Sequence, residues 1–152
     1  MNSEPILDFS ALNKLAEQKN LSLNAQKFIY LIWLGLTPAE ISSANYNTAM
    51  RTVEWGDRTL FVKENKMAEC LAADGGRLLD KGSISSAETE LEKVSISADL
   101  IYKTGFFNMR FEQSELGQPE DIVRIKEMSR HIGISADELD KEYKLYCSKR
   151  KA

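Results

Sequence analysis

The chain has 152 residues, a formal net charge of −3, 43% hydrophobic residues and 28% charged residues. This composition is that of a folded domain and excludes an intrinsically disordered chain. The slightly acidic balance excludes a strongly basic nucleic-acid-binding domain, so any contact with nucleic acid has to come from a local basic patch.

The first ten residues lack the basic and apolar regions of a secretory signal. The most apolar run, residues 28–36, is shorter than the ~20 residues that span a bilayer. Cys70 and Cys147 do not have the spacing of a disulfide framework. We therefore expect a protein of the cytoplasm with no membrane partner.

Three helices are predicted in the first part of the chain. Residues 9–19 carry apolar side chains at helical spacing, and residues 21–36 form a wide apolar stripe with Ser22 as the cap. The run Thr37-Pro38-Ala39-Glu40 has the spacing of a capping box with proline at the first helical position. This run predicts the start of a third, short helix.

The main functional hypothesis rests on residues 36–58. After the short helix, Asn45-Tyr46-Asn47 predicts a turn, and residues 48–55 are expected to form a second helix that ends at Gly56. Two short helices joined by a polar turn are typical of a helix-turn-helix that docks on DNA. Residues 59–62 favour an extended connector without a hairpin partner, so no wing is predicted. The expected DNA-contacting residues are Lys27, Asn47, Thr48, Arg51, Thr52, Arg58 and Lys63.

The central part of the chain is expected to form a helical hairpin that assembles subunits. Residues 64–79 predict a helix that bends at Gly75-Gly76. A capping box at residues 85–88 precedes a long helix in which apolar residues recur at alternating spacings of three and four, as in a coiled coil. One partner of this seam is expected to be the preceding helix and the other a second subunit. The expected oligomerisation residues are Leu91, Val94, Ala98, Ile101, Tyr102 and Phe106.

A second helix-turn-helix candidate lies near the C-terminus. A helix that opens at Pro119, a turn at Gly133-Ile134-Ser135 and a last helix capped by Ser135 fit the general pattern better than the first candidate. We rank it second because residues 119–140 carry three basic and six acidic side chains, whereas residues 21–66 carry five basic and four acidic ones. The basic tail from Lys141 onward either contacts DNA or an acidic partner, or is simply solvated.

No catalytic or metal site is predicted. The single histidine, His131, is expected to pack on an apolar helical face, and Gly75-Gly76-Arg77 is not followed by a phosphate-loop pattern. Glu88, Glu90 and Glu92 lie two residues apart, so they point in different directions on a helix and predict a solvated face. We therefore expect a protein that is not an enzyme and has no cofactor.

Together these elements predict an all-α protein. Its expected parts are an N-terminal helix-turn-helix domain (residues 1–62), a helical hairpin oligomerisation domain (63–113) and a C-terminal helical segment with a basic tail (114–152).

Several short motifs occur in a familiar order: Gln26-Lys27-Phe28, Thr37-Pro38-Ala39-Glu40, Asn45-Tyr46 and, later, Gly105-Phe106-Phe107-Asn108-Met109-Arg110. In this order they resemble the small terminase subunits of tailed bacteriophages. The resemblance implies a ring-forming homo-oligomer that binds double-stranded DNA at the packaging site. It also implies regulation of the ATP-driven large terminase subunit, no nuclease or ATPase activity, and a location in the host cytoplasm.

Two other functions remain open from the residues alone. A transcriptional regulator would use the same helix-turn-helix, acting as a dimer. A helical adaptor would bind protein and make no contact with DNA.

Overall fold

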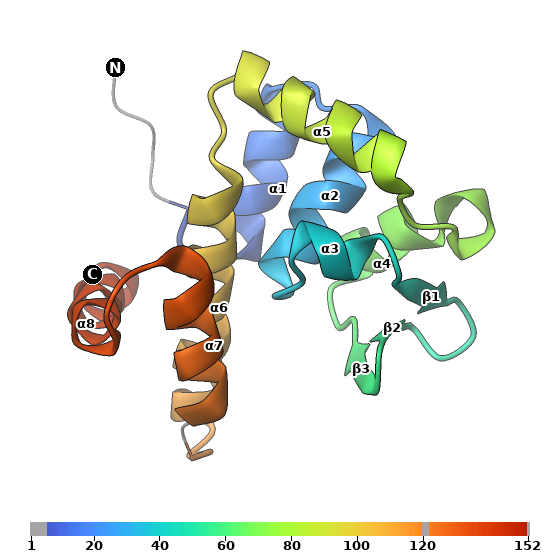
Figure 1. Cartoon of the computed structure of the whole chain (residues 1–152). Helices are drawn as coiled ribbons and strands as arrows, with labels where there is room; N and C mark the ends of the chain where they lie inside the picture. Colours follow the sequence, from blue (N-terminus) through green and yellow to red (C-terminus); the bar gives the residue numbers. More distant parts are fainter. Residues whose placement is uncertain (1–5, 120–121, 152) are drawn as a thin grey trace.

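The computed structural model describes residues 6–119 and 122–151. Within these ranges the fold is mostly helical, with eight α-helices, one 3-10 turn and a small antiparallel sheet of three strands (Figure 1). The expected helical architecture is therefore confirmed in its broad form, whereas the expectation of an all-α chain is wrong at the sheet.

The first two helices agree with the sequence. Helix α1 (Phe9–Gln18) is capped by Asp8 and α2 (Leu23–Trp33) by Ser22, whose hydroxyl accepts a hydrogen bond from the backbone N–H of Ala25. The stretch from Lys27 to Trp33 is buried without a break, because α2 is surrounded by α4, α5 and α6 (Figure 1). Helix α2 is therefore the centre of the core.

Helix α3 (Pro38–Ile41) begins at the predicted capping box. The Thr37 hydroxyl accepts from the backbone N–H of Glu40, and the Glu40 carboxylate accepts from the backbone N–H of Thr37. The remaining Glu40 oxygen accepts from the indole N–H of Trp55 at 3.1 Å. The same carboxylate therefore joins the helix start to the sheet.

The helix expected over residues 48–55 does not form. Instead, β1 (Asn45–Asn47), β2 (Thr52–Trp55) and β3 (Arg58–Phe61) pair in the order β1-β2-β3. Val53 and Trp55 are buried while Thr52 and Glu54 are half-buried, which is the alternation of a strand and not of a helix. Tertiary burial of these two side chains overrode the apparent helical spacing.

The expected bend in the next helix is present, but the helix is shorter than predicted. Helix α4 (Asn65–Ala72) ends in a 3-10 turn (Ala73–Gly76), in which Asp74 and Gly75 take positive φ angles. Gly76 lies against β1, where an added Cβ would stand 2.9 Å from the carbonyl oxygen of Tyr46. This close approach holds the turn beside the sheet.

The predicted long helix is two helices. Helix α5 (Lys81–Lys93) is capped by Asp80 instead of at the predicted box, and α6 (Ala98–Glu115) is capped by Ser97. Between them Ser95 has a φ of +60° and closes the end of α5 with the N–H of Ile96 bonded to the carbonyl oxygen of Leu91. A continuous heptad seam therefore cannot exist.

The six residues expected to join subunits pack inside one chain. Leu91, Ile101, Tyr102 and Phe106 are buried, and Val94 and Ala98 are half-buried against the same core. The expected seam between subunits is wrong, because the break after α5 lets both helices pack on α2.

The last two helices lie beside α6. They are α7 (Ile122–Ile132) and α8 (Ala136–Lys151), and the first residues after Pro119, which were expected to open α7, lie outside the described residues. Phe107 of α6 contacts the rings of Tyr143 and Tyr146 at centroid distances of 5.6 Å. Buried residues of all three predicted segments thus belong to one hydrophobic cluster. Among the residues described, no helix combines the length and apolar character needed to cross a membrane.

Candidate nucleic-acid interface

Arg51 does not project from a helix face. It occupies the last position of the β1–β2 turn with a φ of +56°. Its guanidinium donates to the carbonyl oxygens of Val62 and Lys63 at 3.0 and 3.3 Å and lies over the ring of Phe61, 5.5 Å from the centroid. These contacts connect the β1–β2 turn to the end of β3, so the Arg51 side chain stabilises the sheet.

The two other expected cations of this region pair with carboxylates on helices later in the chain. Arg58 donates twice to the Glu127 carboxylate of α7, at 2.9 and 3.1 Å, and this hydrogen bonding raises the pKa of Arg58. Lys63 donates to Glu112 of α6 at 2.9 Å. Both pairs are substantially exposed, so each contributes little to stability and is weakened by salt.

The expected polar contacts are separated in the same way. The Asn47 side chain accepts from the backbone N–H of Met50 at 3.1 Å and shapes the turn. The Thr52 hydroxyl donates to Glu54 at 3.1 Å, and Thr48 is exposed in the turn. Because β1, a turn and β2 replace the predicted helix, these residues do not form one recognition face.

Lys27 is excluded from any contact with DNA by its burial. Its side chain is 1% exposed, and its ammonium donates to the carbonyl oxygens of Ala73 and Arg77 at 3.2 and 2.7 Å. Asp74 lies 3.8 Å away. Lys27 therefore links α2 to the turn after α4 through the hydrogen bonds of its buried ammonium group. The expectation that Lys27 contacts DNA is wrong.

The second candidate, by contrast, keeps its predicted order of a helix, a short turn and a second helix. A connection of three residues joins α7 to α8, and in it Gly133 takes a φ of +83°. The Ser129 hydroxyl donates to the carbonyl oxygen of Ile134, and the Ser135 hydroxyl accepts from the backbone N–H of Glu138 at 3.1 Å. Met128 and Leu139, one from each helix, are buried. These contacts hold the two helices together at the turn.

Ion pairs change the charge of this element from the value that its sequence suggests. Three of the five carboxylates in α7 and α8 are paired: Glu127 with Arg58, Asp140 with Arg110 and Lys144, and Glu142 with Lys103. Hydrogen bonds from Lys144 and Arg110 hold the pKa of Asp140 below its usual value. Among the described acids of these two helices, only Asp137 and Glu138 lie outside these ion pairs, and both are exposed in the first turn of α8.

The exposed cations outnumber those two acids. They lie along α7 and α8 and include Lys126, Arg130, Lys141, Lys149 and Lys151. The two helices therefore repel phosphate less than the count of charges along their sequence suggests.

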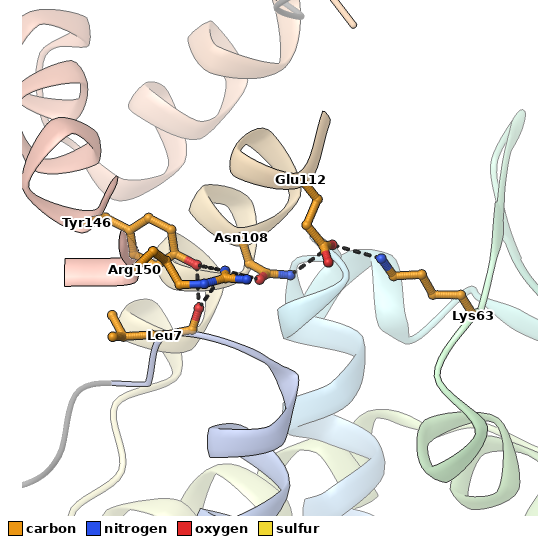
Figure 2. Close-up of polar contacts among 6 residues, drawn as sticks. All are labelled: Leu7, Lys63, Asn108, Glu112, Tyr146 and Arg150. Carbon is orange, nitrogen blue, oxygen red and sulfur yellow. Dashed lines mark hydrogen bonds and ion pairs between the residues drawn. The ribbon is translucent and has the colours of Figure 1, made fainter. Parts of the chain in front are cut away.

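A polar network sets the rotation of α8 (Figure 2). The Tyr146 hydroxyl and the Arg150 guanidinium both donate to the carbonyl oxygen of Leu7, and Arg150 also donates to the Asn108 side chain at 2.7 Å. The Asn108 amide donates to Glu112, which also accepts from Lys63. Arg150, which belongs to the basic tail expected to contact DNA or an acidic partner or to be solvated, therefore points inward, and Lys141 and Lys149 of the same helix are exposed.

Two features were not predicted from the sequence, and only the first of them, the hairpin, has a local signal. The run Thr52-Val53-Glu54-Trp55 alternates polar and apolar residues, and a two-residue Gly-Asp turn follows it, which is a hairpin signal. Glu90, expected on a solvated face, accepts two hydrogen bonds of 2.7 Å from the backbone N–H and hydroxyl of Ser22. No local pattern connects two residues so far apart in sequence.

No group of three His, Cys, Asp or Glu residues in residues 6–119 and 122–151 is placed to hold an ion. His131 is exposed, and its ring lies 4.6 Å from that of Tyr102, so the expected packing on an apolar face is only partial.

The sequence matches no protein-family model, and neither a curated protein nor a solved structure is significantly similar to the chain.

Proposed function

We propose that this protein binds double-stranded DNA through the α7–α8 helix-turn-helix and has no enzymatic activity of its own. The observation that carries the proposal is the three-residue connection, with Gly133 at positive φ and a capped second helix. In helix-turn-helix proteins the second helix enters the major groove while the first lies across the backbone. The corresponding helices here are α8 and α7.

The exposed face of α8 has the composition that such docking needs. Exposed residues recur at helical spacing along the side opposite to Leu139, Tyr143 and Tyr146: they are Asp137, Lys141, Lys144, Leu145 and Ser148. Lysines on this face supply phosphate contacts, which release counterions. Acids in the first turn accept from cytosine amino groups, the role that carboxylates have in base recognition.

Fluorescence anisotropy of a labelled duplex at several salt concentrations tests this proposal. Lys141→Ala should weaken binding and lower the slope of log K against log salt by about 1 if the lysine contacts a phosphate. Lys93→Ala, at the exposed end of α5, is the matched control and should bind as the wild type. Equal affinities for the two variants would remove α8 from the interface.

The same assay compares the two candidate elements. Arg51→Ala should leave binding almost unchanged, because the Arg51 side chain bonds to the end of β3. A loss of binding with Arg51→Ala but not with Lys141→Ala would move the interface back to the sheet.

A narrower proposal rests on the resemblance to small terminase subunits. In this proposal the DNA that the protein recognises is a viral packaging site. Its protein partner is the large terminase subunit, and its active form is a homo-oligomer. Mass measurement by light scattering separates this from the transcriptional regulator, since a ring has many subunits and a regulator two. An adaptor that binds only protein would fail to bind any duplex even at low ionic strength.

A further inference from the structure

Strand β3 is an edge of the sheet with unused backbone groups. The backbone N–H of Val62 donates to the carbonyl oxygen of Arg51, and the antiparallel pairing continues with Leu60 opposite Val53 and Arg58 opposite Trp55. Because hydrogen-bonded pairs alternate along such a ladder, the N–H and C=O groups of Thr59 and Phe61 point away from β2. No other described residue bonds to these groups.

The side chains of the same two residues are also exposed. Thr59 and Phe61 lie on the outer face of the strand, and Phe61 is 58% exposed, although it is a large apolar residue. Leu60 and Val62 point to the opposite face, where Leu60 is half-buried and Val62 is buried. An edge strand that exposes both backbone groups and an aromatic side chain is a template for another strand.

We propose that this edge pairs with the same edge of a second copy of this chain, antiparallel and about a twofold axis at Leu60. In this register Thr59 of each copy lies opposite Phe61 of the partner subunit, and each such pair exchanges two hydrogen bonds. The two sheets become one of six strands. A two-fold contact uses the same patch on both copies, so it closes at the dimer.

Charge complementarity selects this register. Asp57, exposed in the turn between β2 and β3, comes opposite Lys63 of the partner subunit, and Arg58 comes opposite the partner's Val62. Opposite charges that face each other across strands are favourable, whereas like charges are not. If the register between the two copies is shifted by two residues toward the turn, Asp57 lies opposite Phe61 of the partner subunit. The pairing of Asp57 with the partner's Lys63 is then lost.

Lys63 is available for this contact. Its pair with Glu112 is exposed on the lysine side, with 60% of the side chain accessible, so exchange of one carboxylate for another requires little free energy. The strand is short, so the dimer should be weak and should dissociate on dilution. This inference does not depend on DNA binding.

Sedimentation velocity over a range of concentrations tests the dimer with two variants at one position. Thr59→Pro removes an outward N–H, a change that edge strands accept, whereas Thr59→Val keeps the N–H. We expect a doubling of mass with concentration for the wild type and Thr59→Val, and a monomer for Thr59→Pro. A wild-type monomer at every concentration, or a dimer that persists in a folded Thr59→Pro variant, would overturn the proposal.

Charge reversal provides a test that does not touch the backbone. Asp57→Lys and Lys63→Asp should each weaken the dimer, and the double variant should recover it, because the two charges again oppose each other. Hydrogen exchange at Thr59 and Phe61 should slow as the wild type dimerises. Failure of the double variant to recover, with no slowing at these amides, would show that β3 is not the interface.

Discussion

Gly105 of α6 lies directly on the backbone of Trp33 at the end of α2: a Cβ added to Gly105 would stand 2.2 Å from the Trp33 carbonyl oxygen. The missing side chain lets two buried helices cross in contact. Since the obstacle is backbone, it cannot move aside as a flexible side chain would.

Gly105→Ala should therefore be destabilising in spite of the higher helix propensity of alanine. Overpacking of this kind costs about 1–3 kcal/mol, measured as the change in free energy of unfolding in urea. Gly82→Ala in α5 is the matched control, because its nearest atom is the Asp80 carboxylate oxygen at 3.6 Å. The control should be neutral or more stable, and a similar loss in both variants would contradict the close crossing.

Ser95→Gly should stabilise the protein. Ser95 ends α5 at a φ of +60°, a conformation that glycine adopts without strain, and it is exposed, so no packing is lost. The expected gain is about 0.5–1 kcal/mol in thermal or chemical unfolding. Ser86→Gly, in the middle of the same helix, is the control and should lower the stability. A loss of stability in Ser95→Gly would contradict the left-handed conformation at this helix end.

Glu90→Ala should destabilise the start of α2. The Glu90 carboxylate accepts from both the N–H and the hydroxyl of Ser22, and a negative charge at a helix N-terminus is favourable. Because the contact is exposed, we expect a loss of only about 1 kcal/mol. Glu88→Ala, an exposed glutamate on the same helix, should change stability by less, and equal effects would mean that the hydrogen bonds to Ser22 contribute nothing.

Lys27→Met should cost stability without a direct effect on DNA binding. Methionine fills a similar volume, but the carbonyl oxygens of Ala73 and Arg77 lose their donor in a partly buried setting. A buried unsatisfied acceptor costs about 1–3 kcal/mol. Urea unfolding measures the loss, and anisotropy at a temperature where the variant is folded measures binding. Unchanged stability with reduced affinity would restore Lys27 as a DNA contact.

The Cys70 thiol should react slowly in the native state. Burial raises its pKa to about 11, so little thiolate is present at neutral pH. In a Cys147→Ser background, alkylation at pH 8 should be slow in buffer and fast in denaturant. The native rate should keep rising as the pH approaches 11, whereas the unfolded thiol should already react fully well below that value. Equal native and unfolded rates at pH 8 would mean that Cys70 is not protected.

Helix ends and long apolar stripes were predictable because they depend on neighbours within one or two turns. The capping box at Thr37, the Ser22 cap and the stripe of α2 are all contacts between residues at most four positions apart or faces with helical period. The turn at Gly133 and the cap at Ser135 were visible for the same reason.

The sheet was not predicted, because the alternation of residues 52–55 is too short to outweigh a helical spacing. What decided it was pairing with two other strands and burial of Val53 and Trp55. The long helix was divided for a similar reason, since both α5 and α6 gain burial by packing on α2.

By itself, the sequence determined a mostly helical chain, the positions of its principal caps and an exposed turn between the last two helices, all of which follow from short-range interactions. Only the tertiary structure decided which charges are free. Lys27, Arg58 and Lys63 have partners between 46 and 69 positions away in the sequence, while Lys141 is left exposed. A side chain's charge can be read from its residue type, but its partner depends on the path of the whole chain, and the partner determines whether that charge is available to DNA.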